Sequence, residues 1–194
     1  MPISFRDDDD IEQLGEAGYL KVEAGTNGQL LGALFLINAR GEPVEFTYTR
    51  VDIPNTFLWR RQDIRNHAVR TLVTSLFSAC PRVPKYIVCL AGEIDCQLFC
   101  EEIRVSIPVC RIASTLETIP HSEKEFAETE LAEGQHGFWF PLKPAADSAE
   151  HRLFTRLAGA ELLLEPFVRA SVGLKEIYKD KVESDSDRRQ RRKT

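Results

Sequence analysis

The sequence contains no apolar run long enough to cross a lipid bilayer, which takes about 20 residues. Its longest such run, from Leu30 to Ile37, has the length of a buried strand. The N-terminal segment MPISFRDDDDIEQL is acidic and lacks the basic and then apolar order of a secretory signal. We therefore expect a cytoplasmic protein that makes no membrane contact.

Motifs for bound phosphate or zinc are also absent. No segment matches GxxxxGK[ST], GxGxxG or HExxH, which argues against a P-loop, a Rossmann dinucleotide site and a zincin centre. The five cysteines cluster between Cys80 and Cys110 but include no CxxC pair. Because a structural zinc site needs four ligands in paired close spacings, we interpret the cysteines as reduced core thiols. We expect no cofactor.

The composition is typical of a globular protein with a substantial core. The chain has 194 residues, of which 43% are hydrophobic and 28% are charged. Its net charge of −5 is unevenly spread, because residues 1–28 and 117–133 are acidic while residues 50–70 and the tail from Ser184 are basic. Overall acidity argues against a protein that coats DNA, whereas the basic patches leave nucleic-acid contacts open.

The order of predicted elements indicates an α+β fold. Hydrophobic periodicity predicts strands over 18–24, 29–38, 44–53, 85–91 and 103–114, and helices over 63–79, 95–102, 147–164 and 167–182. In the third strand the apolar residues change parity at Arg50, which predicts a β-bulge there. The meander of three strands is thus followed by α-β-α-β units and then by C-terminal helices.

We divide the chain into five segments by composition. They are an acidic polar N-terminal segment (1–17), an α/β core (18–114), an acidic loop or exposed helix (115–135), an aromatic segment with C-terminal helices that pack on the core (136–183), and a basic disordered tail (184–194). The third segment is assigned in this way because it is rich in glutamate and poor in aromatic residues.

This element order resembles the ribonuclease H-like fold over residues 18–165, although no sequence motif supports the resemblance and profilin-like sandwiches compete with it. The resemblance implies two divalent cations held by carboxylates of the first strand, the first helix and the end of the fourth strand. The first strand offers only Glu23, and the helix over 63–79 has no carboxylate after its first turn. Glu93 and Asp95 do follow a strand end. With so few ligands, we expect a catalytically silent protein.

The segment PNTFLWRRQDIR, residues 54–65, is a candidate binding surface. Its aromatic residues are interpreted either as a hydrophobic staple that plugs the core or as contact residues. Arg60 and Arg61 lie beside a helix N-terminus that is already positive, so they need an anion nearby. A carboxylate of this chain, a phosphate or an acidic patch on a partner could supply it. The candidate binding residues are Phe57, Trp59, Arg60, Arg61 and Arg65.

Two more segments are candidates for binding. Phe138, Trp139 and Phe140 cannot all point inward from one extended strand, so either one is exposed or another element or partner covers the segment. The C-terminal tail is either solvated or in contact with nucleic acid or an acidic partner through its arginines, Arg188, Arg189, Arg191 and Arg192.

These observations lead to the hypothesis of a non-catalytic binding or adaptor subunit of a larger cytoplasmic assembly that could handle nucleic acid. We expect a protein partner in a hetero-complex, with nucleic-acid contacts through the basic patches and a homodimer as further options. The alternative is a metal-dependent nuclease or phosphodiesterase of ribonuclease H-like topology. Its metal ligands would be Glu93, Asp95 and either Asp52 or Glu23.

Overall fold

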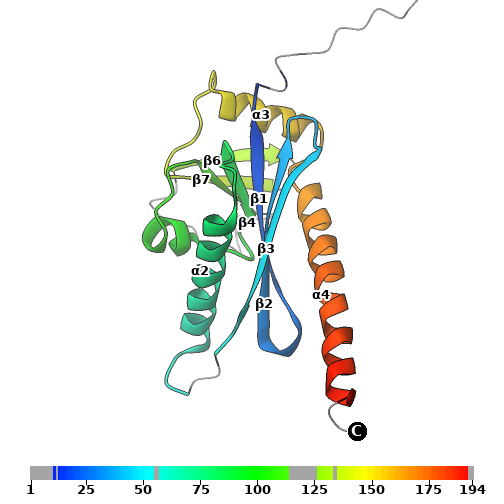
Figure 1. Cartoon of the computed structure of the whole chain (residues 1–194). Coiled ribbons are helices and arrows are strands. Elements are labelled where there is room, and N and C mark those ends of the chain that lie inside the picture. The colour runs from blue at the N-terminus through cyan, green and yellow to red at the C-terminus, as the bar shows by residue number, and fades with distance from the viewer. Residues whose placement is uncertain (1–10, 12, 55–56, 114–125, 133–134, 192–194) are drawn as a thin grey trace, which may run out of the picture.

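The computed structural model describes residues 11, 13–54, 57–113, 126–132 and 135–191 (Figure 1). Along the chain the elements are β1 (Glu16–Ala24), the short turn η1 (Thr26–Gly28), β2 (Gln29–Asn38), β3 (Pro43–Asp52), α2 (Arg61–Ala79), β4 (Tyr86–Leu90), the short helix η2 (Leu98–Glu102), β5 (Val109–Ala113), β6 (Phe126–Ala132), β7 (Gln135–Phe140), α3 (Ala149–Gly159) and α4 (Glu165–Arg191). Among these described helices, no stretch combines the length and apolar character that a bilayer crossing requires.

In the described part of the chain, seven strands form one mixed sheet in the order β3-β2-β1-β4-β5-β7-β6. The first three strands form an antiparallel meander, and β4 and β5 run parallel to β1. The crossover from β3 to β4 passes through α2, as a parallel connection requires. This arrangement confirms the predicted α+β fold with its ribonuclease H-like element order.

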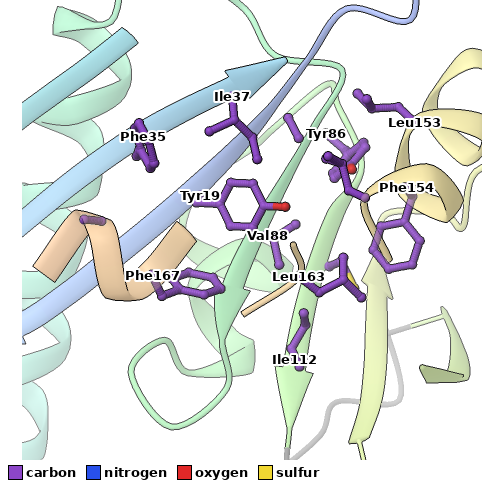
Figure 2. Close-up of a cluster of buried hydrophobic side chains, with 14 of the residues drawn as sticks. Tyr19, Phe35, Ile37, Tyr86, Val88, Ile112, Leu153, Phe154, Leu163 and Phe167 are labelled. Carbon is purple, nitrogen blue, oxygen red and sulfur yellow. The ribbon is translucent and has the colours of Figure 1, made fainter. Parts of the chain in front are cut away.

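Helices cover both faces of the sheet, and Figure 1 shows α2 and α4 on opposite sides of it. The apolar residues of α2 are buried against β2, where Gly32 permits close approach because a Cβ there would overlap the side chain of Leu72. On the other face, α3 and α4 enclose a second apolar cluster that includes Tyr19, Tyr86 and Phe167 (Figure 2). The sheet is therefore a central layer buried on both sides, which explains the continuously apolar sequence of β2.

Coverage on both faces also corrects the predicted bulge at Arg50. Phe46 packs against the cluster under α4, whereas Val51 packs against the cluster under α2, so apolar residues of both parities are partly buried without any slip at Arg50. The register of β2 against β3 shifts instead between Leu36 and Ile37. A change of parity indicates a bulge only where one face of a strand is covered, and both faces of β3 are covered.

Two of the predicted segments differ in part from the structure. Within the segment predicted as an acidic loop or exposed helix, residues 126–132 form strand β6, and residues 114–125 lie outside the described residues. Within the predicted disordered tail, α4 continues to Arg191, and residues 192–194 lie outside the described residues. Strand pairing with β7 supplies the backbone hydrogen bonds that make a glutamate-rich segment extended.

Candidate functional site

The carboxyl ends of three parallel strands, β1, β4 and β5, meet at one edge of the sheet. β1 pairs in antiparallel fashion with β2 on its other side, so the direction of pairing changes at β1. In open sheets covered by helices, ligands bind at the carboxyl ends of the strands where the topology changes. The same edge receives the N-terminus of α2, because β3 runs parallel to β1 and leads into that helix.

An ion pair between Lys21 and Glu93 lies at this edge. The ladder between β1 and β4 ends at the pair of Leu20 and Cys89. Beyond it, the backbone N–H of Val22 donates to Oε2 of Glu93 at 3.0 Å, and Nζ of Lys21 donates to Oε1. Only 13% of the Lys21 side chain and 18% of the Glu93 side chain are exposed. One carboxylate thus joins the central strand to the segment that follows β4.

A tight turn after β4 places Glu93 against β1. The backbone N–H groups of Glu93 and Ile94 both donate to the carbonyl of Leu90 at 3.0 Å. Ile94 is fully buried under α2 and anchors the turn in the core. The position of Glu93 is therefore set by packing as well as by its own hydrogen bonds.

The ion pair is flanked by cavities of different character. A groove of about 670 Å³ lies beside α4, with Lys21, Glu93 and Lys175 among its polar lining and Phe167 and Val168 among its apolar lining. A smaller cavity of about 100 Å³ lies on the α2 side and is lined mainly by polar residues, namely Gln62, Arg65, Asn66, Glu93, Asp95, Gln97 and Glu102. Glu93 lines both, so a ligand could reach the pair from either side of the sheet.

Cations continue along the edge next to the groove. A second hollow of about 520 Å³ shares Lys175 with it and adds Arg50 and Lys179 from β3 and α4. The guanidinium of Arg50 lies 5.7 Å from the ring centre of Tyr178, which holds that charge at the surface of the hollow. The two hollows together present apolar walls and four cations, Lys21, Lys175, Arg50 and Lys179, beside two carboxylates, Glu93 and Glu23. Because the cations are in excess, this path suits a polyanion.

The residues present do not fit the pair of divalent cations that the ribonuclease H-like resemblance implies. Among the described residues, no group of three His, Cys, Asp or Glu side chains could hold a metal ion. Glu93 holds the ammonium of Lys21, and Glu23 accepts a hydrogen bond from the hydroxyl of Ser171 at 2.7 Å. Asp95 accepts from the backbone N–H of Gln97 at 2.9 Å, and Asp52 from the side-chain amide of Gln29 at 2.7 Å. Glu93 and Asp95 line the same small cavity, but all four predicted ligands hold other partners and no three of them gather around one point.

The segment over residues 54–65 forms an exposed approach to α2 rather than a core plug. Phe57 and Leu58 are 97% and 96% exposed, so the interpretation as a hydrophobic staple is wrong. Trp59 is half exposed, with its ring centre 5.6 Å from that of His67 on α2. Arg60 donates to both carboxylate oxygens of Asp63, at 2.8 and 3.0 Å, so its anion is internal. This hydrogen bond raises the pKa of Arg60.

Arg61 and Arg65 remain exposed on the first turns of α2, and Arg65 lines the small cavity beside Glu93. Both lie near the N-terminus of α2, at the edge that carries the ion pair. Of the predicted binding residues, Arg65 is the one that lines a cavity together with Glu93.

The three consecutive aromatic residues belong mainly to the core. Phe138 and Trp139 are 6% and 2% exposed, and Phe140 packs against the cluster on the α2 face. The ring of Trp139 lies 4.9 Å from that of Phe154 on α3. Their interpretation as a contact surface is therefore corrected, because strand β7 has covered faces on both sides and neighbouring side chains can both be buried.

The remaining candidates are the cysteines and the C-terminal arginines. Cys89, Cys96 and Cys110 are buried, and the five cysteines form no disulfide with one another. Arg192 lies outside the described residues, and so do the side chains of Arg188, Arg189 and Arg191 at the end of α4. Their predicted role in binding stays a prediction.

Sequence reasoning missed Lys21. The signal was present, since Lys21 is the one cation in the strand segment GYLKVEA, whose neighbours Leu20 and Val22 are buried in the sheet. A lysine in a buried strand needs a partner because an unpaired charge is costly to bury. Glu93, 72 positions away, is that partner.

Comparison with solved structures identifies the fold. Endonuclease V from Bacillus subtilis aligns over 87% of this chain and 82% of its own, with a TM-score of 0.51 and 12% sequence identity. Human Endonuclease V aligns over 90% and 89%, with a TM-score of 0.50 and 11% identity. The catalytic domain of human Endonuclease V aligns over 87% of this chain and 84% of its own, with a TM-score of 0.51 and 10% sequence identity. This chain has the fold of Endonuclease V. No protein-family model matches it, and no curated protein matches it in sequence.

The likeness to Endonuclease V overturns the leading sequence-based hypothesis. The hypothesis of a non-catalytic adaptor subunit was built on a shortage of carboxylates, whereas three structures of a nuclease share the fold over more than four fifths of their length. A protein partner in a hetero-complex has no support from these likenesses. The alternative, a nuclease of ribonuclease H-like topology, is the better supported of the two.

Proposed function

We propose that this chain is a nuclease that hydrolyses phosphodiester bonds of nucleic acid at the Lys21–Glu93 pair. The observation that carries the proposal is the position of this pair. It lies at the carboxyl ends of β1 and β4, in the lining of a groove of about 670 Å³, in a fold shared with Endonuclease V. A partly buried acid and cation at such an edge can act on a phosphodiester that enters from the groove.

The nucleic acid would follow the cations along this edge. Lys175, Arg50 and Lys179 lie along the two hollows beside α4 and would contact phosphates on one side. On the α2 side, Arg61 and Arg65 would do the same. The arginines at the end of α4 would add further phosphate contacts if the strand extended that far.

The exposed aromatic residues before α2 would contact bases. Phe57 and Trp59 present 97% and 51% of their surface to solvent, and arginines follow them directly in the sequence. Aromatic rings that stack on unpaired bases contribute about 1–3 kcal/mol per base, and neighbouring cations hold the backbone. A single strand, or a locally opened duplex, is therefore the substrate class that this edge favours.

In the proposed reaction, a water oxygen bonds to phosphorus while the bond from phosphorus to the leaving sugar oxygen breaks. Glu93 accepts a proton from the attacking water and later returns it to solvent. Lys21 neutralises charge on the non-bridging phosphate oxygens, and solvent protonates the leaving oxygen. Each carboxylate oxygen of Glu93 makes one hydrogen bond in the structure and has lone-pair capacity left for the water proton.

The test is a cleavage assay with fluorescently labelled single-stranded and double-stranded DNA and RNA. Glu93→Gln should lower the cleavage rate by about 10²–10⁴-fold, the usual contribution of a general base. Glu150→Gln is the matched control, because Glu150 on α3 also pairs with a lysine, Lys85, at 3.9 Å but lies away from the groove. Absence of cleavage of every substrate, or equal rates in the two variants, would rule out the proposed function.

A further inference from the structure

The Lys21–Glu93 pair conflicts with the metal chemistry that the fold leads one to expect. Carboxylates of the first strand and of the end of the fourth strand would normally be the ligands of a divalent cation in a ribonuclease H-like nuclease. Here the first strand presents an ammonium, and it donates to the carboxylate that follows the fourth strand. The first strand and the segment after the fourth strand thus meet through a cation and a carboxylate instead of through two carboxylates.

The ammonium is held in place by its surroundings. Along the same face of β1, Tyr19 is buried and Glu23 is bound by Ser171 of α4, so Lys21 lies between two fixed neighbours. With 13% of its side chain exposed, it has little freedom to turn away from Glu93. Like charges a few ångströms apart repel strongly where little water reaches them. A divalent cation at the same carboxylate would face this repulsion twice over.

We infer that the ammonium of Lys21 takes the place of a divalent cation at Glu93, so that this centre binds no metal there. The net charge of the pair is then zero, as it would be for two carboxylates that share one divalent cation. The role of the pair in cleavage rests on the proposed function. The absence of metal binding at Glu93 does not, since it can be measured without any substrate. A nuclease with this centre cleaves at an unchanged rate when divalent cations are chelated.

The test exchanges the built-in cation for a metal. Lys21→Asp places a carboxylate opposite Glu93, so this variant should be less stable than the wild type in EDTA. About 5 mM MnCl₂ should then raise its melting temperature by roughly 3–6 °C, as expected for ligand binding to the folded state alone. The wild-type protein should shift by less than about 1 °C under the same conditions. The double variant Lys21→Asp/Glu93→Gln should lose most of the gain.

Lys85→Asp is the matched control, because it makes the same charge reversal opposite a glutamate, Glu150, at a more exposed pair away from the groove. It should show no gain with manganese. If Lys21→Asp fails to fold, Lys21→Met replaces it, because methionine removes the charge and keeps an aliphatic side chain. Direct measurement of manganese binding to the wild type then decides the question. Manganese that binds the wild type and requires Glu93 would overturn the inference. So would a folded Lys21→Asp protein that gains nothing from manganese.

The two proposals can fail separately. If no nucleic acid is cleaved but manganese rescues only Lys21→Asp, the nuclease proposal fails and the inference about Lys21 stands. If cleavage occurs but requires magnesium or manganese held by Glu93, the nuclease proposal stands and the inference fails.

Discussion

Replacing Lys21 by methionine removes the charge of the ion pair while it keeps a long unbranched side chain in the strand. The carboxylate of Glu93 would retain only the backbone N–H of Val22, at 3.0 Å. Breaking a fully buried pair by removal of one partner costs about 3–5 kcal/mol. Because 13% and 18% of the two side chains are exposed, water can reach the remaining charge. We therefore expect a loss of about 2–3 kcal/mol in the free energy of unfolding.

A surface pair on α4 provides the control for this loss. Lys179 donates to Glu176 at 2.9 Å, but 67% of each side chain is exposed. Exposed pairs of this kind contribute little, so Lys179→Met should cost less than about 0.5 kcal/mol. Both substitutions exchange the same residue types, and their difference isolates the effect of burial.

The assay is equilibrium unfolding in urea, followed by circular dichroism, with thermal melts alongside. For a chain of this length, 1 kcal/mol corresponds to about 2–4 °C, so Lys21→Met should melt roughly 4–12 °C below the wild type. Combining it with Glu93→Gln should cost about 1–2 kcal/mol less than the sum of the single effects, because both remove one interaction. Equal stabilities of Lys21→Met and Lys179→Met would refute the ion pair and, with it, the proposed centre.

Two further predictions concern the core and the nucleic-acid edge. Tyr19 donates to a main-chain carbonyl at 2.7 Å, whereas the buried hydroxyl of Tyr86 has no hydrogen-bond partner among the described residues. Tyr19→Phe should cost about 1 kcal/mol and Tyr86→Phe nothing, and an equal cost would contradict this difference. Burial raises the pKa of both phenols, so above about pH 10 the unfolded chain loses these protons while the folded chain keeps them. The free energy of unfolding of the wild type should therefore fall between about pH 9 and 11, and it should fall by less in Tyr19→Phe and in Tyr86→Phe, each of which lacks one of the phenols. Binding of single-stranded DNA should weaken with salt, and Arg61→Ala/Arg65→Ala should reduce the slope of log K against log salt by about 1–2, with Arg152→Ala on α3 as a control that leaves it unchanged.

Much of the fold could be predicted from local pattern. The apolar run of β2 and the helical spacing in α2 appear in the sequence within a residue or two of their observed bounds, because burial repeats with the period of each element. The predicted bulge at Arg50 and the idea that Phe138, Trp139 and Phe140 form a contact surface have one cause, because both assume that only one face of a strand is covered, whereas helices cover both faces of this sheet. The misassigned acidic segment has another cause, since its strand β6 depends on pairing with β7.

The candidate site was far less predictable. Glu93 was found, because a carboxylate just past a buried strand can be recognised without knowledge of the rest of the chain. The sequence offered it a role only in the alternative hypothesis, as a metal ligand with Asp95, because the partner that it does bind comes from another strand. Hydrophobicity left Phe57 either as a core plug or as a contact residue, and the structure, in which 97% of its surface is exposed, excludes the core plug. The hydrophobicity of a residue does not determine whether the folded chain buries it, because burial depends on which elements pack around it.

The sequence by itself determined the first five strands and the helices α2 and α3, since these depend on residue spacings of two and of three to four, but it did not determine strand β6 or the length of α4. It also determined the charge of each segment and the lack of a motif for bound phosphate or zinc. Only the tertiary structure decided that Lys21 and Glu93 meet, because the parallel pairing of β1 with β4 joins positions 72 residues apart. The function proposed here depends on that meeting, and long-range pairing is what a local pattern does not contain.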